Sequence, residues 1–279
     1  MRPFKDGLSL VLRRPSVIIG FFALNLILAR IGTVPFQLGA SHIMGHSLAG
    51  GGLLHGFDLA LLAELLSRPE MGQGGGAAAG ISAVLFALIS LLLLPGVYFA
   101  YASGARVSRE SLLAACGRHL WRFIRLAVVF FFCAAILGGI LGLLAKLVGH
   151  AADHSTREQL SFWVGLGSAA VILVAMTLLR MWFDLAQAHV VIRDQKAVRK
   201  SLAAGFRLLR ARGLRLLGVY LLVTVLALVV AALGLRCWYQ LVPSASVFGA
   251  FLVGQGILLL LLIARFWQRA AAVVVVSAP

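Results

Sequence analysis

The sequence predicts an all-α integral membrane protein with six transmembrane helices, and composition is the first reason. Of the 279 residues, 61% are hydrophobic and only 12% are charged, and the mean hydropathy is +1.00. A soluble domain of this length cannot cover so much apolar side chain with so few charges. Two further observations support the prediction: the spacing of the charge-free segments and the places where basic residues gather.

Charge-free segments of transmembrane length recur along the chain. A helix needs about 20 apolar residues to cross a hydrocarbon core of about 30 Å. The first span is the least regular, because Arg30 and Pro35 interrupt its apolar sequence. We place the six spans near residues 16–39, 79–103, 126–145, 160–179, 216–235 and 246–270.

Basic residues mark one side of the membrane. They gather before the first span, between the second and third, between the fourth and fifth, and after the sixth, whereas the opposite loops hold few. Lys and Arg near span ends favour the cytoplasmic side, so both termini are expected to be cytoplasmic. The net charge of +16 is then matched by anionic lipid headgroups on the cytoplasmic face, and nucleic acid is not an expected partner.

The basic segments before the third and fifth spans resemble each other. Residues 109–129 read RESLLAACGRHLWRFIRLAVV, and residues 199–219 read RKSLAAGFRLLRARGLRLLGV. At an offset of 90, the matched residues are Arg109 and Arg199, Ser111 and Ser201, Leu112 and Leu202, Ala114 and Ala204, Arg122 and Arg212, Arg125 and Arg215, and Leu126 and Leu216.

A third copy opens the chain. In residues 4–20, Gly7 and Leu10 align with Gly205 and Leu208. Self-similarity at a regular spacing indicates a repeat architecture, and repeats are common in membrane proteins that carry solutes. We therefore expect one membrane domain over residues 1–279 with three repeats, each an interfacial helix followed by two spans. The repeat units are near 1–106, 107–196 and 197–279.

Each basic segment has the pattern of a helix that lies in the membrane surface. At about 100° per residue, Leu202, Phe206 and Leu209 fall on one arc, and the basic residues of the segment lie outside it. An apolar face with arginines beside it is typical of an interfacial helix. Two roles remain open: orientation and anchoring alone, or specific binding of an anionic lipid headgroup. The candidate headgroup ligands are Arg122, Arg125, Arg207, Arg210, Arg212 and Arg215.

Four charged residues lie within or at the edge of predicted spans, namely Arg30, Arg180, Asp184 and Arg265. Arg180 and Asp184 are four residues apart, so they could pair on one helix face. Arg180 is close to the inner boundary, where snorkelling beside a tryptophan is the alternative to a functional charge. Arg30 is deeper and is the better candidate for a buried charge, although its side chain can still reach the outer headgroups.

Two histidine pairs fall in loops predicted on the outer side: His42 with His46, and His150 with His154. Histidines four apart on a helix can bind zinc, and solvated loop histidines are the alternative. No nucleophile–base, paired-carboxylate or nucleotide-binding motif is found. The sequence therefore predicts no catalytic residue, no metal and no cofactor.

Three segments carry a resemblance to known proteins: FKDGLSLVLRRP (4–15), WFDLAQAHVVIRD (182–194) and RLLRARGLRLLGVYLL (207–222). With them, the layout resembles the bacterial six-span inner-membrane proteins of the YciC-like group and the membrane domain of the glycerophosphodiester phosphodiesterases. The resemblance covers nearly the whole chain. It implies a place in the bacterial inner membrane and supplies no catalytic residues.

Three functional hypotheses follow. The first is a non-enzymatic membrane protein that binds or moves a lipid-like or small solute between its repeats. The second is an accessory or structural subunit that assembles with a membrane-protein partner. The third is an outer-face metalloenzyme that uses the histidine pairs. Bound lipid, a co-purifying protein or stoichiometric metal would discriminate among them.

Overall fold

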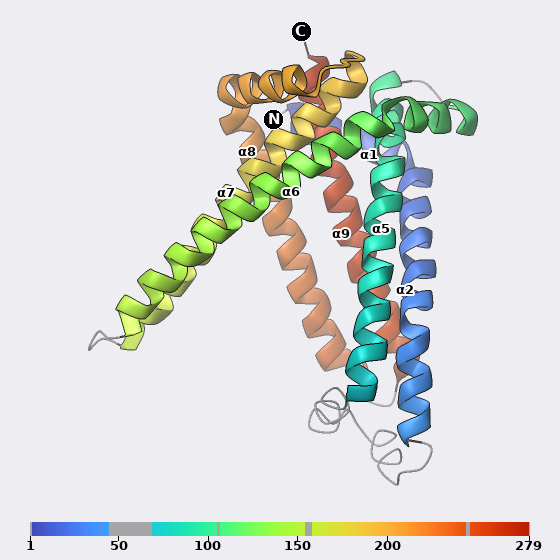
Figure 1. Cartoon of the computed structure of the whole chain (residues 1–279), viewed down its shortest axis with the longest axis vertical. Helices are drawn as coiled ribbons and strands as arrows, with labels where there is room; N and C mark the ends of the chain where they lie inside the picture. The colour runs from blue at the N-terminus through green and yellow to red at the C-terminus, as the bar shows by residue number, and fades with distance from the viewer. Residues whose placement is uncertain (1, 45–68, 105–106, 154–157, 244–245, 279) are drawn as a thin grey trace. The chain divides into compact units, whose positions relative to one another are not determined.

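The computed structural model describes residues 2–44, 69–104, 107–153, 158–243 and 246–278 (Figure 1). The helices are α1 (Arg2–Leu12), α2 (Pro15–Met44), α5 (Pro69–Ser103), α6 (Arg109–Asp153), α7 (Glu158–Ile192), α8 (Val198–Leu241) and α9 (Val247–Ser277). No strand occurs in these described ranges. Six of the helices are long and apolar enough to cross a membrane, which confirms the prediction of an all-α chain with six such helices.

The helices pack as two units. Unit 1 comprises Met1–Arg13, Leu91–Val225 and Phe266–Pro279, and unit 2 comprises Arg14–Ser90 and Leu226–Arg265. Unit 1 holds all of α1, α6 and α7, the second part of α5, the first part of α8 and the end of α9. It therefore contains the whole expected second repeat together with parts of the other two.

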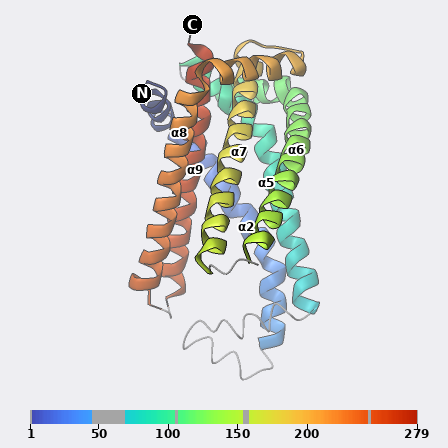
Figure 2. The same cartoon turned by 90° about the vertical axis from the view of Figure 1, so that its left-hand side faces the viewer.

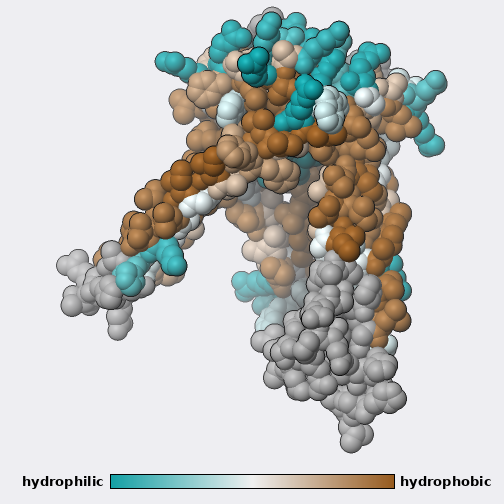
Figure 3. Space-filling view, viewed as in Figure 1, coloured by the Kyte–Doolittle hydropathy of each residue, from teal (hydrophilic) through white to brown (hydrophobic). Residues whose placement is uncertain are grey.

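The core of unit 1 is aromatic and aliphatic and lies where these helices converge. Its fully buried side chains include Tyr98, Phe123, Phe183, Tyr220 and Phe266, which come from five different helices. Hydrophilic side chains gather over this end of the unit, where α8 begins (Figure 3). The polar surface and the densest packing thus lie at the same end of unit 1.

Beyond that core, α6 and α7 continue as a paired hairpin (Figure 2). At Gly138 of α6, an added Cβ would lie 3.1 Å from the Cε of Met176 on α7, so the two helices approach closely there. Most of the remaining surface of the hairpin is hydrophobic and exposed, including Phe131, Phe132 and Phe162. Exposed apolar side chains over this length match a lipid environment better than water.

The basic segments join their spans in two ways. At the start of the chain, Arg13 and Arg14 separate α1 from α2, whose first residue is Pro15, because a residue before proline is disfavoured in the helical region. In α6 and α8, the helix continues without a break from the basic segment into the following span. Figure 1 shows that the first part of α8 runs across the view before the helix turns downward.

Unit 2 consists of α2, the first part of α5, the second part of α8 and most of α9. Its helices α8 and α9 approach closely, because an added Cβ at Gly234 would lie 2.5 Å from the Cγ1 of Ile257. On α2, Arg30 donates a hydrogen bond from Nη1 to Oε1 of Gln37 at 2.5 Å, and both side chains are exposed. Arg30 therefore lies on the surface of α2, and a neighbour on its own helix satisfies part of its donor capacity. Its role as a charge within the membrane stays a prediction.

Candidate functional site

The basic start of α8 is fixed to the end of α7 by a tryptophan and a glycine. Trp182 donates a hydrogen bond from Nε1 to the carbonyl oxygen of Leu202 at 2.9 Å. Three residues after Leu202, a Cβ added at Gly205 would lie 3.1 Å from both the carbonyl oxygen of Trp182 and the backbone nitrogen of Ala186. Because both neighbours are backbone atoms, they cannot move aside for a larger side chain.

The same arrangement holds α1 against the end of α9. Trp267 donates from Nε1 to the carbonyl oxygen of Phe4 at 2.9 Å. Three residues after Phe4, a Cβ at Gly7 would lie 3.1 Å from the backbone nitrogen of Ala271. Ala271 follows Trp267 by four positions, as Ala186 follows Trp182. The two contacts therefore use the same residue types at the same spacing.

The start of α6 also docks on the end of a long helix, α5. Here the glycine, Gly96, belongs to the long helix and not to the basic segment. A Cβ at Gly96 would lie 2.6 Å from the Sγ of Cys116, and the side chain of Leu112 is almost as close. The Cys116 thiol also donates to the carbonyl oxygen of Leu93, with a sulfur–oxygen distance of 3.6 Å. All three basic segments thus pack against the end of a long apolar helix within unit 1.

A buried polar cluster lies in the core behind these contacts. The side chain of Asp184 is 2% exposed. Its Oδ2 accepts a hydrogen bond from the Tyr220 hydroxyl at 2.9 Å, and its Oδ1 accepts one from the Tyr98 hydroxyl at 3.3 Å. The Tyr98 hydroxyl also lies 3.1 Å from Oε1 of Gln187, so its single proton serves two acceptors. Charge-assisted bonds of this kind are among the stronger ones in proteins.

Gln268 extends the cluster to α9. Its Nε2 donates to the carbonyl oxygen of Tyr220 at 3.2 Å and to Oγ1 of Thr224 at 2.9 Å. Side chains of α5, α7, α8 and α9 therefore meet in one hydrogen-bonded group. Sequence analysis singled out Asp184 but missed Tyr98, Tyr220 and Gln268. The sequence signal that could have identified these three residues is the occurrence of a few polar side chains inside otherwise apolar segments.

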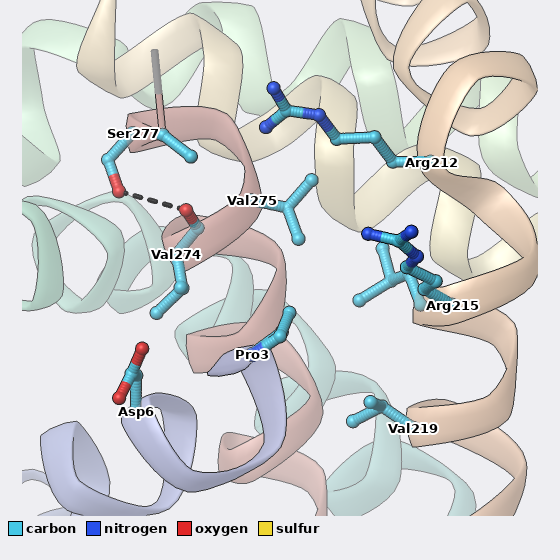
Figure 4. A pocket seen from close by; sticks show the side chains of 10 residues that line it. Pro3, Asp6, Arg212, Arg215, Val219, Val274, Val275 and Ser277 are labelled. Atoms are coloured by element: carbon cyan, nitrogen blue, oxygen red, sulfur yellow. Dashed lines mark hydrogen bonds between the residues drawn. The ribbon is translucent and has the colours of Figure 1, made fainter. Parts of the chain in front are cut away.

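A cavity with a volume of about 730 Å³ opens at the polar end of unit 1. Arg212 and Arg215 of α8 line one side, and Asp6 of α1 lies across from them (Figure 4). The rest of the lining is largely apolar and comes from Pro3, Leu216, Val219, Val274 and Val275. Drug-sized ligands occupy pockets of roughly 300–1,000 Å³. The cavity thus has room for a ligand with one anionic part and one apolar part.

A separate group of polar side chains, Arg122, His119 and Asp194, joins α6 to the turn after α7. Arg122 donates from Nη1 to Oδ1 of Asp194 at 2.6 Å, and the same nitrogen lies 3.2 Å from Nδ1 of the buried His119. The Arg122 hydrogen bond is the main reason why the pKa of Asp194 is lower than usual. Asp194 has φ +45°, and Gln195 donates to the carbonyl oxygen of Val190, which gives the turn that commonly ends a helix.

The other predicted site residues are scattered. Arg180 is exposed and Arg265 is half-buried. Arg122 pairs with Asp194, whereas Arg125 lies over the ring of Trp121 at 5.3 Å and is exposed. Arg207 and Arg210 are exposed. The role of these arginines as headgroup ligands stays a prediction.

The structure describes the side chain of only one of the four histidines in the predicted pairs. His46 and His154 lie outside the described residues, and the side chain of His42 is not described. His150 is exposed on α6. Among the residues that were described, no group of three or more metal-ligating side chains comes together.

Comparison of the chain with protein-family models, with curated proteins and with solved structures finds no match. The resemblance to the YciC-like group stays a prediction on the segments quoted above.

Proposed function

We propose that the protein binds an anionic amphiphile, a lipid-like molecule with a negatively charged headgroup, at the polar end of unit 1. The observation that carries this proposal is the cavity that combines Arg212 and Arg215 with an apolar wall. An arginine presents five N–H donors in a planar fork and can bind a carboxylate or phosphate through two bonds at once. An apolar tail would lie against Val219, Val274 and Val275.

Charge balance favours an anion in this cavity. The side chains that line it include two guanidinium groups and the one carboxylate of Asp6, so the local formal charge is positive. Basic residues near an anionic membrane surface each contribute about 1 kcal/mol of attraction. We infer that the ligand enters from the membrane surface with its headgroup at the arginines. Binding is the minimal activity, and movement of the ligand across the membrane would build on it.

The architecture proposed with this function is a ring of three repeats. Each basic segment docks on the second long helix of the preceding repeat: α6 on α5, α8 on α7, and α1 on α9. The last pair returns to the first repeat, as a cyclic order requires. We propose a pseudo-threefold arrangement with all three basic segments on the cytoplasmic side.

The binding proposal is tested with protein purified in a mild detergent and an unbiased mass-spectrometric inventory of its lipids. Retained anionic lipid at a fixed molar ratio, reduced in the double variant Arg212→Gln/Arg215→Gln, is the supporting result. Arg199→Gln is the matched control, because Arg199 is an exposed arginine on the same helix and does not line the cavity. Equal lipid retention by both variants would overturn the proposal.

The cytoplasmic orientation is tested separately by cysteine labelling in a version without the native cysteines. Ser201 is fully buried and unsuitable, so Lys200→Cys probes the basic end and Tyr239→Cys probes the opposite end of α8, since both native residues are exposed. A membrane-impermeant reagent applied to intact cells should label only position 239. Labelling at position 200 alone would reverse the orientation.

A second candidate is an accessory subunit of a membrane complex. The α6–α7 hairpin favours it, because added Cβ atoms at Gly139 and Gly142 would meet nothing within 4 Å. Small residues let another helix approach closely within a membrane. A protein that co-purifies with the native chain and is lost with Gly139→Leu/Gly142→Leu would support this role.

A further inference from the structure

A second and smaller cavity lies beside the start of α8. Its volume is about 270 Å³, and three basic side chains line it, namely His189, Arg193 and Arg207. Ala204, Leu208 and Val276 supply much of the remaining wall. The lining comes from the end of α7, the residue after it, the start of α8 and the end of α9. The ends of α7 and α9 and the start of α8 therefore meet here.

The three basic groups lack compensation from the part of the chain that the structure describes. There, neither Arg193 nor Arg207 forms an ion pair, and the buried Nδ1 of His189 has no hydrogen-bond partner. Both arginines nevertheless lie close enough to His189 to act on it electrostatically. No acidic side chain lines the cavity. Convergence of the two guanidinium charges costs free energy unless an anion binds between them.

The composition of the lining indicates which anion. Two guanidinium groups and an imidazole nitrogen converge from different elements, so they can reach different oxygens of one tetrahedral ion. Guanidinium groups bind phosphate through paired N–H bonds. The small volume and the short side chains around the basic groups suit a compact headgroup better than a long apolar chain.

We propose that this cavity binds a phosphoryl group through Arg193, Arg207 and His189. The phosphoryl group belongs either to a water-soluble phosphate compound or to a phosphate-bearing lipid headgroup, because the same chemistry recognises both. The site is separate from the larger cavity, where Arg212 and Arg215 bind the amphiphile. The two cavities share only Ala278 among the residues that line them, so the new site does not depend on the proposed function.

The test uses the full chain in nanodiscs of zwitterionic phosphatidylcholine. In the first arm, inorganic phosphate is titrated and its binding is measured by isothermal calorimetry. In the second arm, the discs also contain phosphatidic acid, a phosphate monoester lipid, and native mass spectrometry counts the retained lipid. Saturable phosphate binding identifies a soluble ligand, whereas retention of phosphatidic acid alone identifies a lipid headgroup.

Variants assign the signal to the cavity. Arg193→Gln/Arg207→Gln should weaken binding at least about tenfold, since each arginine supplies charge-assisted bonds. Arg199→Gln is the matched exposed control, and Arg212→Gln/Arg215→Gln should leave the phosphate binding measured by calorimetry unchanged. Because phosphatidic acid is itself an anionic amphiphile, each double variant should lose only its own part of the retained phosphatidic acid. If the first variant folds poorly, Arg207→Lys is used in its place. It keeps the positive charge but lacks the planar guanidinium group with its paired N–H donors, and should weaken binding by a smaller factor.

Three outcomes overturn the proposal. The first is the absence of saturable binding in both arms. The second is equal binding by Arg193→Gln/Arg207→Gln and Arg199→Gln. The third is loss of binding with Arg212→Gln/Arg215→Gln alone, which would assign the phosphoryl group to the larger cavity.

Discussion

The two halves of α7 have similar apolar composition and opposite environments. In the first half, Phe162, Trp163 and Leu166 are mostly exposed. In the second half, Met181, Phe183 and Leu185 are almost completely buried. Hydropathy along the helix does not separate these halves, because Gln159–Ile192 forms one continuous candidate membrane span. The buried half differs in carrying Trp182, Asp184 and Gln187, each of which hydrogen-bonds to another element.

The difference between the two halves of α7 indicates which interactions determine helix packing in this chain. Where lipid surrounds a helix, burial of apolar side chains against another helix gains little, because lipid tails are equally apolar. Close backbone approach and hydrogen bonds then select which surfaces meet. The buried half of α7 has both, through Gly205 on the neighbouring helix and through the side chains of Trp182 and Asp184.

The largest expected effect comes from removal of the carboxylate at the centre of the packed half. Asp184→Leu keeps the size of the side chain but removes the carboxylate that accepts from the Tyr220 hydroxyl, and one of the two acceptors of the Tyr98 hydroxyl. We expect a loss of about 2–4 kcal/mol of unfolding free energy. Thermal unfolding in detergent, followed by fluorescence, measures it. Trp163→Leu, in the exposed half of the same helix, is the control and should change stability little.

The next effect tests close approach instead of hydrogen bonding. Gly205→Val places side-chain atoms against the backbone of Trp182 and Ala186, and overpacking of this kind costs about 1–3 kcal/mol. Gly165→Val on the outer half of α7 meets nothing within 4 Å and is the matched control. Equal melting temperatures for the two variants would mean that the α7–α8 contact is looser than described.

A smaller effect is expected at the two tryptophans that dock the basic segments. Trp182→Phe and Trp267→Phe each remove one hydrogen bond to a backbone carbonyl, worth about 0.5–1.5 kcal/mol. The proposed ring of three repeats requires the two losses to be similar, because the contacts are alike. Chemical unfolding curves give both values, with Trp163→Phe as the reference. A large loss for one variant and none for the other would argue against equivalent repeats.

The smallest effect is dependent on pH and lies outside the spans. The pKa of Asp194 is lowered by the hydrogen bond from Arg122, so the ionised carboxylate stabilises the fold above the ordinary carboxyl pKa. This contribution should disappear as the pH falls through the lowered pKa of the folded state. Asp194→Asn tolerates the same positive φ and should be slightly less stable than the native chain at pH 7.

Melting temperatures of both proteins between pH 7 and pH 3 check this prediction. The two curves should approach each other toward the acidic end, as the native carboxylate takes up its proton. A difference that persists or widens at low pH would show that the Arg122–Asp194 pair is not its cause.

Much of the fold was predictable because charge and hydropathy act locally along the chain. The six long apolar helices follow directly from the charge-free segments. The partners of Asp184 were not predictable, because Tyr98 and Tyr220 lie 86 and 36 residues away from it in sequence, and the helix spacing of Arg180 suggested a nearer partner. The equivalence of Gly7 and Gly205 was visible as an alignment, but its reason, a close backbone approach in both places, required the structure.

The contact between α1 and α9 has a consequence for biogenesis. Phe4 and Trp267 are 263 residues apart in sequence, and at roughly 5–20 residues per second the ribosome needs on the order of tens of seconds to make the intervening chain. During that time the end of α9 is not yet available, so α1 cannot form this contact. The packing of α1 is therefore completed only after α9 has been synthesised, and a chain arrested before α9 would leave the side of α1 that faces Trp267 and Ala271 uncovered.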